Sequence, residues 1–167
     1  DQFDSIKKTL MHLKGKPLTI RTLDVGNDKK VPSIEKYLTK SPNPALGLRA
    51  IRLTLAFPKI FKRQITAILR ASSYGNIRIM LPMVSNVSEL IETKKIITEV
   101  KKDLLKKNKR LKITTPKIGV LIETPAAALI SEELAKNCDF FAIGTNDLTM
   151  YTLAIDRGDE EVAKIYD

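Results

Sequence analysis

The sequence predicts an α/β fold built from parallel strands that alternate with helices. Four short apolar runs are separated by longer segments in which apolar residues recur every three or four positions. Each run is apolar nearly throughout, which is typical of strands in a parallel sheet covered by helices. Such βα units occur as open doubly wound sheets or as closed (β/α)8 barrels, and the periodicity alone leaves both architectures open.

The four predicted strands are bounded by proline, glycine and polar residues, which commonly end strands. They are "PLTIRTLD" (17–24), "IRIMLPMV" (77–84), "KIGVLIE" (117–123) and "DFFAIG" (139–144). Between them the apolar period changes from that of a strand to that of a helix.

Helix start signals stand between the predicted strands. The predicted helices span 43–57, 58–73, 86–107 and 125–137. Pro58 suits the first position of the second of these helices. Asn86 with Glu89 forms a capping box for the third. Thr124 can cap the fourth helix, and Pro125 can begin it.

Polar side chains gather where the predicted strands end. Arg21 and Asp24 close the first strand, Glu123 closes the third, and Asn146 and Asp147 follow the fourth. In both βα architectures the active-site groups lie at the carboxyl ends of the strands. The strand entrances show no comparable cluster, so the sequence predicts a functional site at the carboxyl edge of the sheet.

Two of these residues are candidate metal ligands. Glu123 and Asp147 follow neighbouring strands of the predicted sheet, whose spacing is about 4.8 Å. Two carboxylates at that spacing can share one Mg²⁺, leaving its other positions to water and substrate oxygens. Taken singly, Glu123 could instead interact with the N-terminus of the following helix, and Asp147 could begin a turn.

Arginines near the same edge suit an anionic ligand. Arg21 and Arg157 could act with a metal ion to stabilise a phosphoryl group in transfer, because guanidinium groups match phosphate oxygens. Arg157 could equally pair with a neighbouring aspartate. Arg49, expected within the first turns of the helix 43–57, could also reach the site.

The basic composition leaves a different class of function open. The chain of 167 residues carries a formal charge of +10, and the segment 101–112 holds seven basic residues. Such a run is typical of the solvated face of a helix, but it could also form a basic binding module. No aromatic residues are interleaved with it, and we expect no nucleic acid partner.

The remaining composition favours the cytoplasm. No apolar run approaches the roughly 18 residues that a membrane span needs, and we expect no membrane insertion. The single cysteine, Cys138, excludes an internal disulfide framework and fits a reducing compartment.

Five motifs resemble the enzyme I family of the bacterial phosphotransferase system, the phosphoenolpyruvate–protein phosphotransferases. They are "RTLDVGNDK", "NPALGLRAIR", "RIMLPMV", "IETPAAALI" and "FFAIGTNDLTMYTLAIDRG", and the resemblance runs through nearly the whole chain. "GTNDLT" alone is shared by the wider phosphoenolpyruvate-utilising family. "ETPAAA" with "YTLAIDRG" favours enzyme I over the alternative, a relative of pyruvate phosphate dikinase or phosphoenolpyruvate synthase.

The resemblance implies a (β/α)8 TIM barrel that binds phosphoenolpyruvate and Mg²⁺. Residues 1–167 would form a single incomplete barrel domain that supplies about the second to fifth strands. By similarity, the metal ligands would be Glu123 and Asp147, and the substrate-binding residues would be Arg21, Arg49, Asn146, Asp147 and Arg157.

In that family the barrel passes the phosphoryl group to a histidine on a separate N-terminal domain, which phosphorylates the phosphocarrier protein HPr for sugar uptake. The family enzymes dimerise through their barrels. The acceptor histidine, the first barrel strand with its arginine, and the late acid cysteine have no counterpart in these 167 residues. We therefore expect no catalytic residue in the chain and no turnover by the chain alone.

Overall fold

A four-stranded parallel sheet forms the centre of the molecule. The computed structural model describes residues 1–26, 41–156 and 158–165. The strands are β1 (Leu18–Arg21), β2 (Ile77–Leu81), β3 (Lys117–Ile122) and β4 (Phe140–Ile143). All pair in parallel and lie in chain order, β1-β2-β3-β4. The predicted α/β class is confirmed, and the unreversed order is consistent with part of a barrel, because doubly wound sheets reverse at a switch point.

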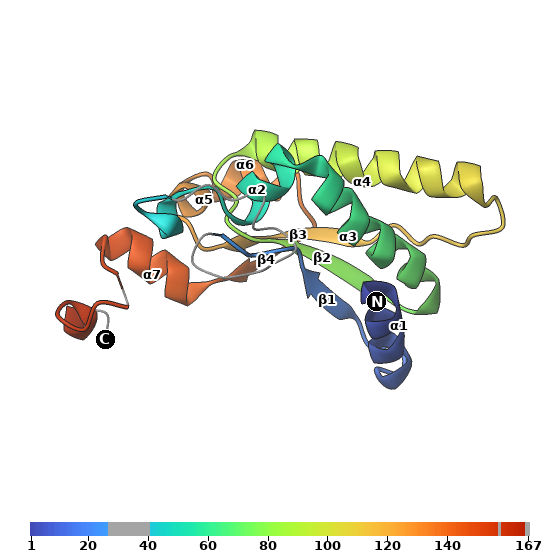
Figure 1. Cartoon of the computed structure of the whole chain (residues 1–167), viewed down its shortest axis with the longest axis horizontal. Helices are drawn as coiled ribbons and strands as arrows, with labels where there is room; N and C mark the ends of the chain where they lie inside the picture. The colour runs from blue at the N-terminus through green and yellow to red at the C-terminus, as the bar shows by residue number, and fades with distance from the viewer. Residues whose placement is uncertain (27–40, 157, 166–167) are drawn as a thin grey trace.

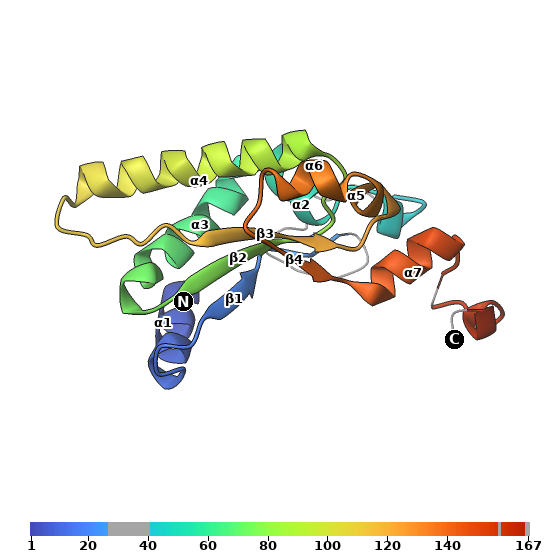
Figure 2. The ribbon, with the colours of Figure 1, turned by 180° about the vertical axis from the view of Figure 1, so that it is seen from behind.

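Helices cover one face of this sheet. The α-helices are α1 (Gln2–His12), α2 (Ala50–Ala56), α3 (Pro58–Ala71), α4 (Val87–Lys107), α5 (Pro125–Leu129), α6 (Ser131–Ala135) and α7 (Thr145–Leu153). Short 3-10 turns are η2 (Pro44–Leu46), η3 (Ser72–Tyr74) and η4 (Ala163–Ile165). Figures 1 and 2 show α2 to α6 on the same side of the sheet, with α1 and α7 near its opposite ends. None of the described helices has the length and apolar character needed to cross a membrane.

The hydrophobic core lies between the sheet and these helices. Alternate residues of β2 face the core and are buried, and Ile79 pairs in register with the buried Ile118 of β3. Phe61 and Ile65 of α3 pack into the same cluster. Arg21, the last residue of β1, is exposed on the opposite face of the sheet, away from the described helices α2 to α6 (Figures 1 and 2).

The predicted helix starts at three positions are confirmed. The side chain of Asn86 accepts the N–H of Glu89 at 3.0 Å, and the Glu89 carboxylate accepts the N–H of Asn86 at 3.1 Å. Pro58 begins α3. The Thr124 hydroxyl accepts the N–H of Ala127 at 3.1 Å, and α5 begins at Pro125.

Two predicted helices are wrong in extent. The segment 43–57 contains the turn η2 and then α2, which begins only at Ala50. Arg49 is extended, with φ −147° and ψ 166°, and the N–H of Ala50 donates to the carbonyl of Val25 at 3.2 Å. The backbone here is therefore bonded to the segment after β1 instead of continuing a helix. The segment 125–137 is likewise divided, into α5 and α6, at Ile130.

Candidate functional site

A pocket of about 460 Å³ lies at the carboxyl end of the sheet. Its charged and amide-bearing lining residues are Arg21, Asp24, Arg49, Glu123, Asn146 and Asp147. The structure thus brings together five of the six site residues predicted from the sequence. The sixth, Arg157, lies outside the described residues.

The parallel strands deliver these side chains to one edge. Arg21 is the last residue of β1, and Glu123 follows the last residue of β3 directly. Asn146 and Asp147 lie in the first turn of α7, which starts one residue after Gly144. The alternative interpretation of Asp147, as the start of a turn, does not hold, because Thr145–Leu153 is helical. The charges of a helix N-terminus favour a carboxylate at that position.

Glu123 is a buried carboxylate with an unusual proton affinity. Glu123 is 2% exposed, and its Oε1 accepts a hydrogen bond from the backbone N–H of Met83 at 2.6 Å. Burial raises the pKa of Glu123 from 4.5 to about 7; the Met83 N–H opposes the shift, and the negative charges of Asp147 and Asp24 add to it. Glu123 also packs across Gly144, where an added Cβ would lie 2.8 Å from Oε2.

Asp24 joins the two described arginines of the pocket. Its Oδ1 accepts Nη2 of Arg49 at 3.0 Å, and its Oδ2 lies 3.4 Å from Nη1 of Arg21. Nη2 of Arg49 also lies 3.8 Å from Oδ2 of Asp147. The side chains of Arg49 and Asp24 are only 6% and 7% exposed, whereas that of Arg21 is 47% exposed. Arg49 reaches the pocket, as predicted, but from the residue before α2.

Tyr151 is a neighbour of the site that the motifs did not identify. Its hydroxyl donates to the carbonyl of Ala45, which ties α7 to the turn before α2. Burial raises the pKa of Tyr151, while the positive charge of Arg49 opposes the shift. Tyr151 lies four residues after Asp147, so both project from one face of α7. That spacing becomes a signal only once the helix is known.

Residues 1–167 match the family described as PEP-utilising enzyme, PEP-binding domain. The chain belongs to this family. It is 45% identical over 166 residues to the phosphoenolpyruvate-protein phosphotransferase of Bacillus subtilis (strain 168), covering 99% of the chain and 29% of that relative. It is 45% identical to the protein of the same name in Staphylococcus epidermidis, and 44% in Buchnera aphidicola subsp. Schizaphis graminum, again with 99% of the chain covered, and 28% and 29% of those relatives.

These relatives confirm the resemblance to the enzyme I family, because all three carry its name. The chain spans less than a third of the length of each, 28% or 29%. The similarity therefore concerns one part of these relatives, and the family model describes that part as the PEP-binding domain.

The two carboxylates of the pocket suit Mg²⁺ better than they suit a metal ion whose ligands are all protein side chains. The described residues contain no group of three or more His, Cys, Asp and Glu side chains that could hold an ion. Two carboxylates, Glu123 and Asp147, suit Mg²⁺, which keeps several positions for water and substrate oxygens. Burial is the main cause of the raised pKa of Glu123, and the negative charges of Asp147 and Asp24 add to it. A divalent cation at this position would favour the ionised carboxylate.

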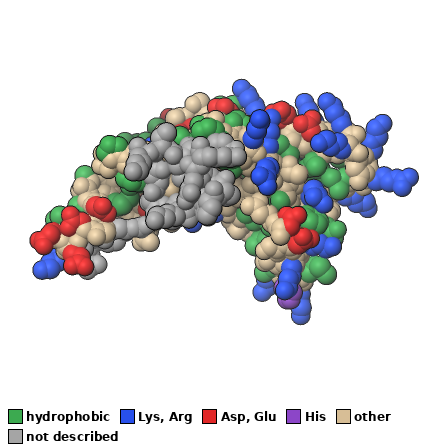
Figure 3. All heavy atoms as spheres, viewed as in Figure 1, with side chains coloured by type: hydrophobic (Ala, Val, Ile, Leu, Met, Phe, Trp, Pro, Cys, Tyr) green, Lys and Arg blue, Asp and Glu red, His purple; other side chains and the backbone are tan. Residues whose placement is uncertain are grey.

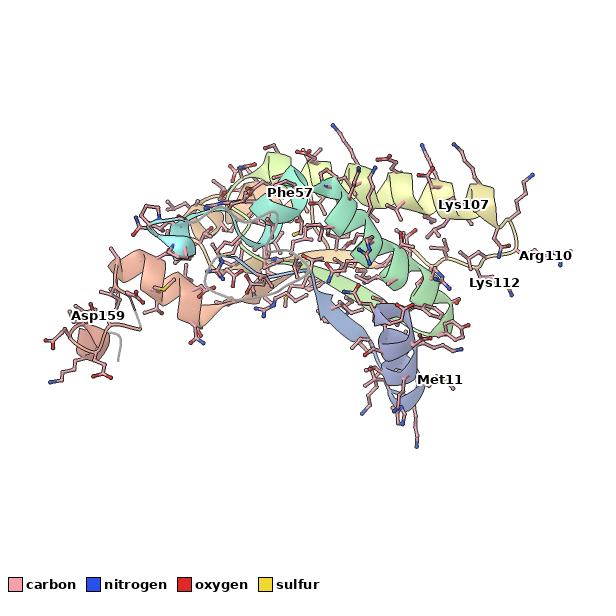
Figure 4. The ribbon with its side chains drawn as sticks, viewed as in Figure 1. Met11, Phe57, Lys107, Arg110, Lys112 and Asp159 are labelled. Carbon is pink, nitrogen blue, oxygen red and sulfur yellow. The ribbon has the colours of Figure 1, made fainter. Side chains whose placement is uncertain are left out.

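The basic segment lies away from this pocket. Figure 3 shows Lys and Arg side chains gathered over the end of the molecule that holds α1 and the C-terminal part of α4. In Figure 4, Lys107, Arg110 and Lys112 lie at that end, while Asp159, beyond α7, lies at the other. Lys107, Arg110 and Lys112 are exposed, as expected for a solvated surface.

Proposed function

We propose that this chain binds phosphoenolpyruvate and Mg²⁺ in the pocket at the carboxyl end of the sheet. A longer protein of which it forms part would transfer the phosphoryl group to an enzyme histidine and then to HPr, for sugar uptake. One observation carries the proposal: carboxylates and guanidinium groups from β1, the β3 end, α7 and the α2 entrance line one pocket. The names of the relatives support the choice of donor and of a protein acceptor.

Each group of the pocket has a task in this reaction. Glu123 and Asp147 would hold Mg²⁺, which when bound neutralises charge on the substrate oxygens. Arg21, the more exposed arginine, would donate N–H groups to the phosphate, and Asn146 would donate its amide N–H to the substrate. Arg49 and, outside the described residues, Arg157 would add positive charge near the phosphate.

The phosphoryl acceptor must come from elsewhere. In the transfer, the bond from phosphorus to the enol oxygen breaks as a bond to an imidazole nitrogen forms, and the enolate then takes a proton to give pyruvate. His12 is the only histidine of the chain. It is exposed in α1, where Nδ1 lies 2.7 Å from the carbonyl of Lys8. We therefore infer that the chain alone binds substrate without completing catalysis.

We further infer that residues 1–167 are one incomplete barrel domain of a cytoplasmic enzyme that is a homodimer at full length. The exposure of apolar side chains at the β4 edge supports further βα units beside it. Ile143 of β4 is 69% exposed and Leu129 of α5 is 86% exposed, which is unusual for large apolar residues of a complete barrel.

Calorimetric titration tests the binding proposal. The titrated proteins are this chain and a chimera in which the chain replaces the 166 aligned residues of the Bacillus subtilis relative. We expect the chimera to bind phosphoenolpyruvate only with Mg²⁺, and the variants Glu123→Ala and Asp147→Ala to weaken binding at least 100-fold. The matched control is Glu133→Ala, an exposed glutamate of α6. Binding that persists without either carboxylate would refute the metal site.

A further inference from the structure

Asp24 contacts both arginines of the described pocket lining, Arg21 and Arg49. Each of its oxygens faces a different guanidinium group, Oδ1 that of Arg49 at 3.0 Å and Oδ2 that of Arg21 at 3.4 Å. Asp24 itself lies in the irregular segment after β1, and its side chain is 7% exposed. A buried carboxylate shared in this way fixes the two guanidinium groups relative to each other.

The contacts rank Asp24 as the nearer partner of Arg49. Nη2 of Arg49 lies 3.0 Å from Asp24 and 3.8 Å from Asp147. The first distance is that of a charge-assisted hydrogen bond, and the second exceeds hydrogen-bond length. Nη2 of Arg49 is therefore hydrogen-bonded to Asp24, while Asp147 lies close to the same nitrogen but beyond hydrogen-bond length.

Asp24 also acts on the arginine that faces solvent. Arg21 is about half exposed, and a long side chain at such a position loses rotamer freedom when it is fixed. A guanidinium group has five N–H donors in a rigid fork, so contact through Nη1 is compatible with donation to an anion from other edges.

Electrostatics alone would make Asp24 unfavourable for the substrate. The described lining residues already include the carboxylates of Glu123 and Asp147, and Asp24 adds another negative charge where an anion would bind. An aspartate with no positioning role would therefore weaken binding of phosphoenolpyruvate, and its removal would strengthen binding.

We propose that Asp24 is a positioning residue that orients Arg21 and Arg49 together for the phosphorylated substrate. This inference rests on the proposed function, because it assigns the arginines to that substrate. Asn has the size of Asp, but Asp24→Asn replaces one of the two oxygens by an NH2 donor, which would face one of the two guanidinium groups where Asp24 offers an acceptor to each.

Steady-state kinetics of the chimera test this role. We expect Asp24→Asn to raise the KM for phosphoenolpyruvate about tenfold while kcat changes less than threefold, because ground-state orientation is lost. An unchanged or lowered KM would overturn the proposal, and a lowered KM is the result that charge removal alone predicts. The control is Asp139→Asn, which removes a carboxylate that accepts the N–H of Ile118 at 2.7 Å near the strand entrances. It should lower the Tm and leave KM unchanged.

A second measurement does not depend on turnover. In this chain, nitrogen-15 NMR should resolve separate Nη signals for Arg49, because a buried ion pair slows guanidinium rotation. We expect Asp24→Asn to merge them, and unchanged Arg49 signals would overturn the positioning role. If the unsubstituted chimera fails to use phosphoenolpyruvate, or tolerates Glu123→Ala, the proposed function fails instead, while the Arg49 signals still decide the role of Asp24.

Discussion

Met83 donates its backbone N–H to Oε1 of Glu123 at 2.6 Å from a left-handed conformation, with φ 57°. A non-glycine residue in that region costs about 1–2 kcal/mol, and Met83 is held there by a side chain that is 1% exposed. Ala50, which directly follows Arg49, also has a positive φ, of 49°. Left-handed backbone therefore stands directly beside one charged residue of the pocket, Arg49, and bonds to another, Glu123.

The protonation of Glu123 should make folding stability depend on pH. The folded pKa of about 7 exceeds the ordinary 4.5, so the folded state binds this proton more tightly than the unfolded state. The stability it contributes is full below pH 4.5 and is lost as the pH rises through 7. Glu123→Gln stays neutral at every pH and avoids this loss. The free energy of unfolding of Glu123→Gln minus that of the unsubstituted chain should therefore rise by about 2 kcal/mol from pH 5 to pH 8.

Urea unfolding of both proteins with a chelator present measures this difference. The exposed Glu133→Gln serves as the control and should track the unsubstituted chain at both pH values. If the free energy of unfolding of Glu123→Gln, relative to that of the unsubstituted chain, were the same at pH 8 as at pH 5, the raised pKa of a buried Glu123 would be contradicted.

Proton binding at Glu123 should compete with Mg²⁺. With a pKa of about 7, only about one Glu123 in eleven is ionised at pH 6, against about ten in eleven at pH 8. Because metal ligands must be deprotonated, the affinity for Mg²⁺ should fall about tenfold from pH 8 to pH 6. Calorimetric titration of the chimera at pH 6 and pH 8 measures its affinity for Mg²⁺. Asp147→Asn should abolish Mg²⁺ binding at both pH values. Equal affinities would exclude Glu123 as a ligand with this pKa.

The sequence could predict the strand ends because they depend on local signals. Glu123 stands between the apolar β3 and the cap formed by Thr124 and Pro125, and both the strand and the helix start are readable from neighbouring residues. Parallel pairing then places Glu123 near the residues that follow β4, since carboxyl ends of parallel strands share one edge. The periodicity leaves the strand order and the covered face open, because doubly wound sheets and barrels share it.

The contacts within the pocket depend on tertiary structure and could not be predicted in the same way. The bond between Arg49 and Asp24 joins residues 25 positions apart, and it requires an extended Arg49 that helical periodicity argues against. The helix α7 was missed because its apolar and polar residues do not separate clearly into two faces. The resemblance to enzyme I named Arg49 as a site residue, whereas Asp24 emerges as the partner of both arginines only from their distances.

The buried ion pair of Arg49 and Asp24 should couple strongly. Arg49→Met removes a buried cation that lies against the carboxylates of Asp24 and Asp147, which should lower the free energy of unfolding by about 3–5 kcal/mol. A double-mutant cycle with Asp24→Asn should give a coupling energy of about 1.5–3 kcal/mol.

An exposed pair provides the comparison for that cycle. Lys62 and Glu99 lie closer, at 2.7 Å, but their side chains are 38% and 55% exposed. Solvent screening should keep their coupling below about 1 kcal/mol. If the two cycles gave equal coupling, burial would not be what strengthens the Arg49 contact.

Gly144 should be required for the position of Glu123. A Cβ added at Gly144 would lie 2.8 Å from both Cβ and Oε2 of Glu123, so Gly144→Ala must push the carboxylate aside. We expect a loss of about 1–3 kcal/mol in stability and a weaker affinity of the chimera for Mg²⁺, measured by unfolding and calorimetry.

Gly119→Ala is the matched control, because its Cβ would meet the ring of Phe140 at 2.4 Å and not Glu123. It should destabilise the sheet to a similar degree yet leave the affinity for Mg²⁺ within about twofold, since overpacking at Phe140 displaces no proposed ligand. An equal loss of Mg²⁺ affinity in both variants would mean that general loosening of the sheet, and not displacement of Glu123, controls the site.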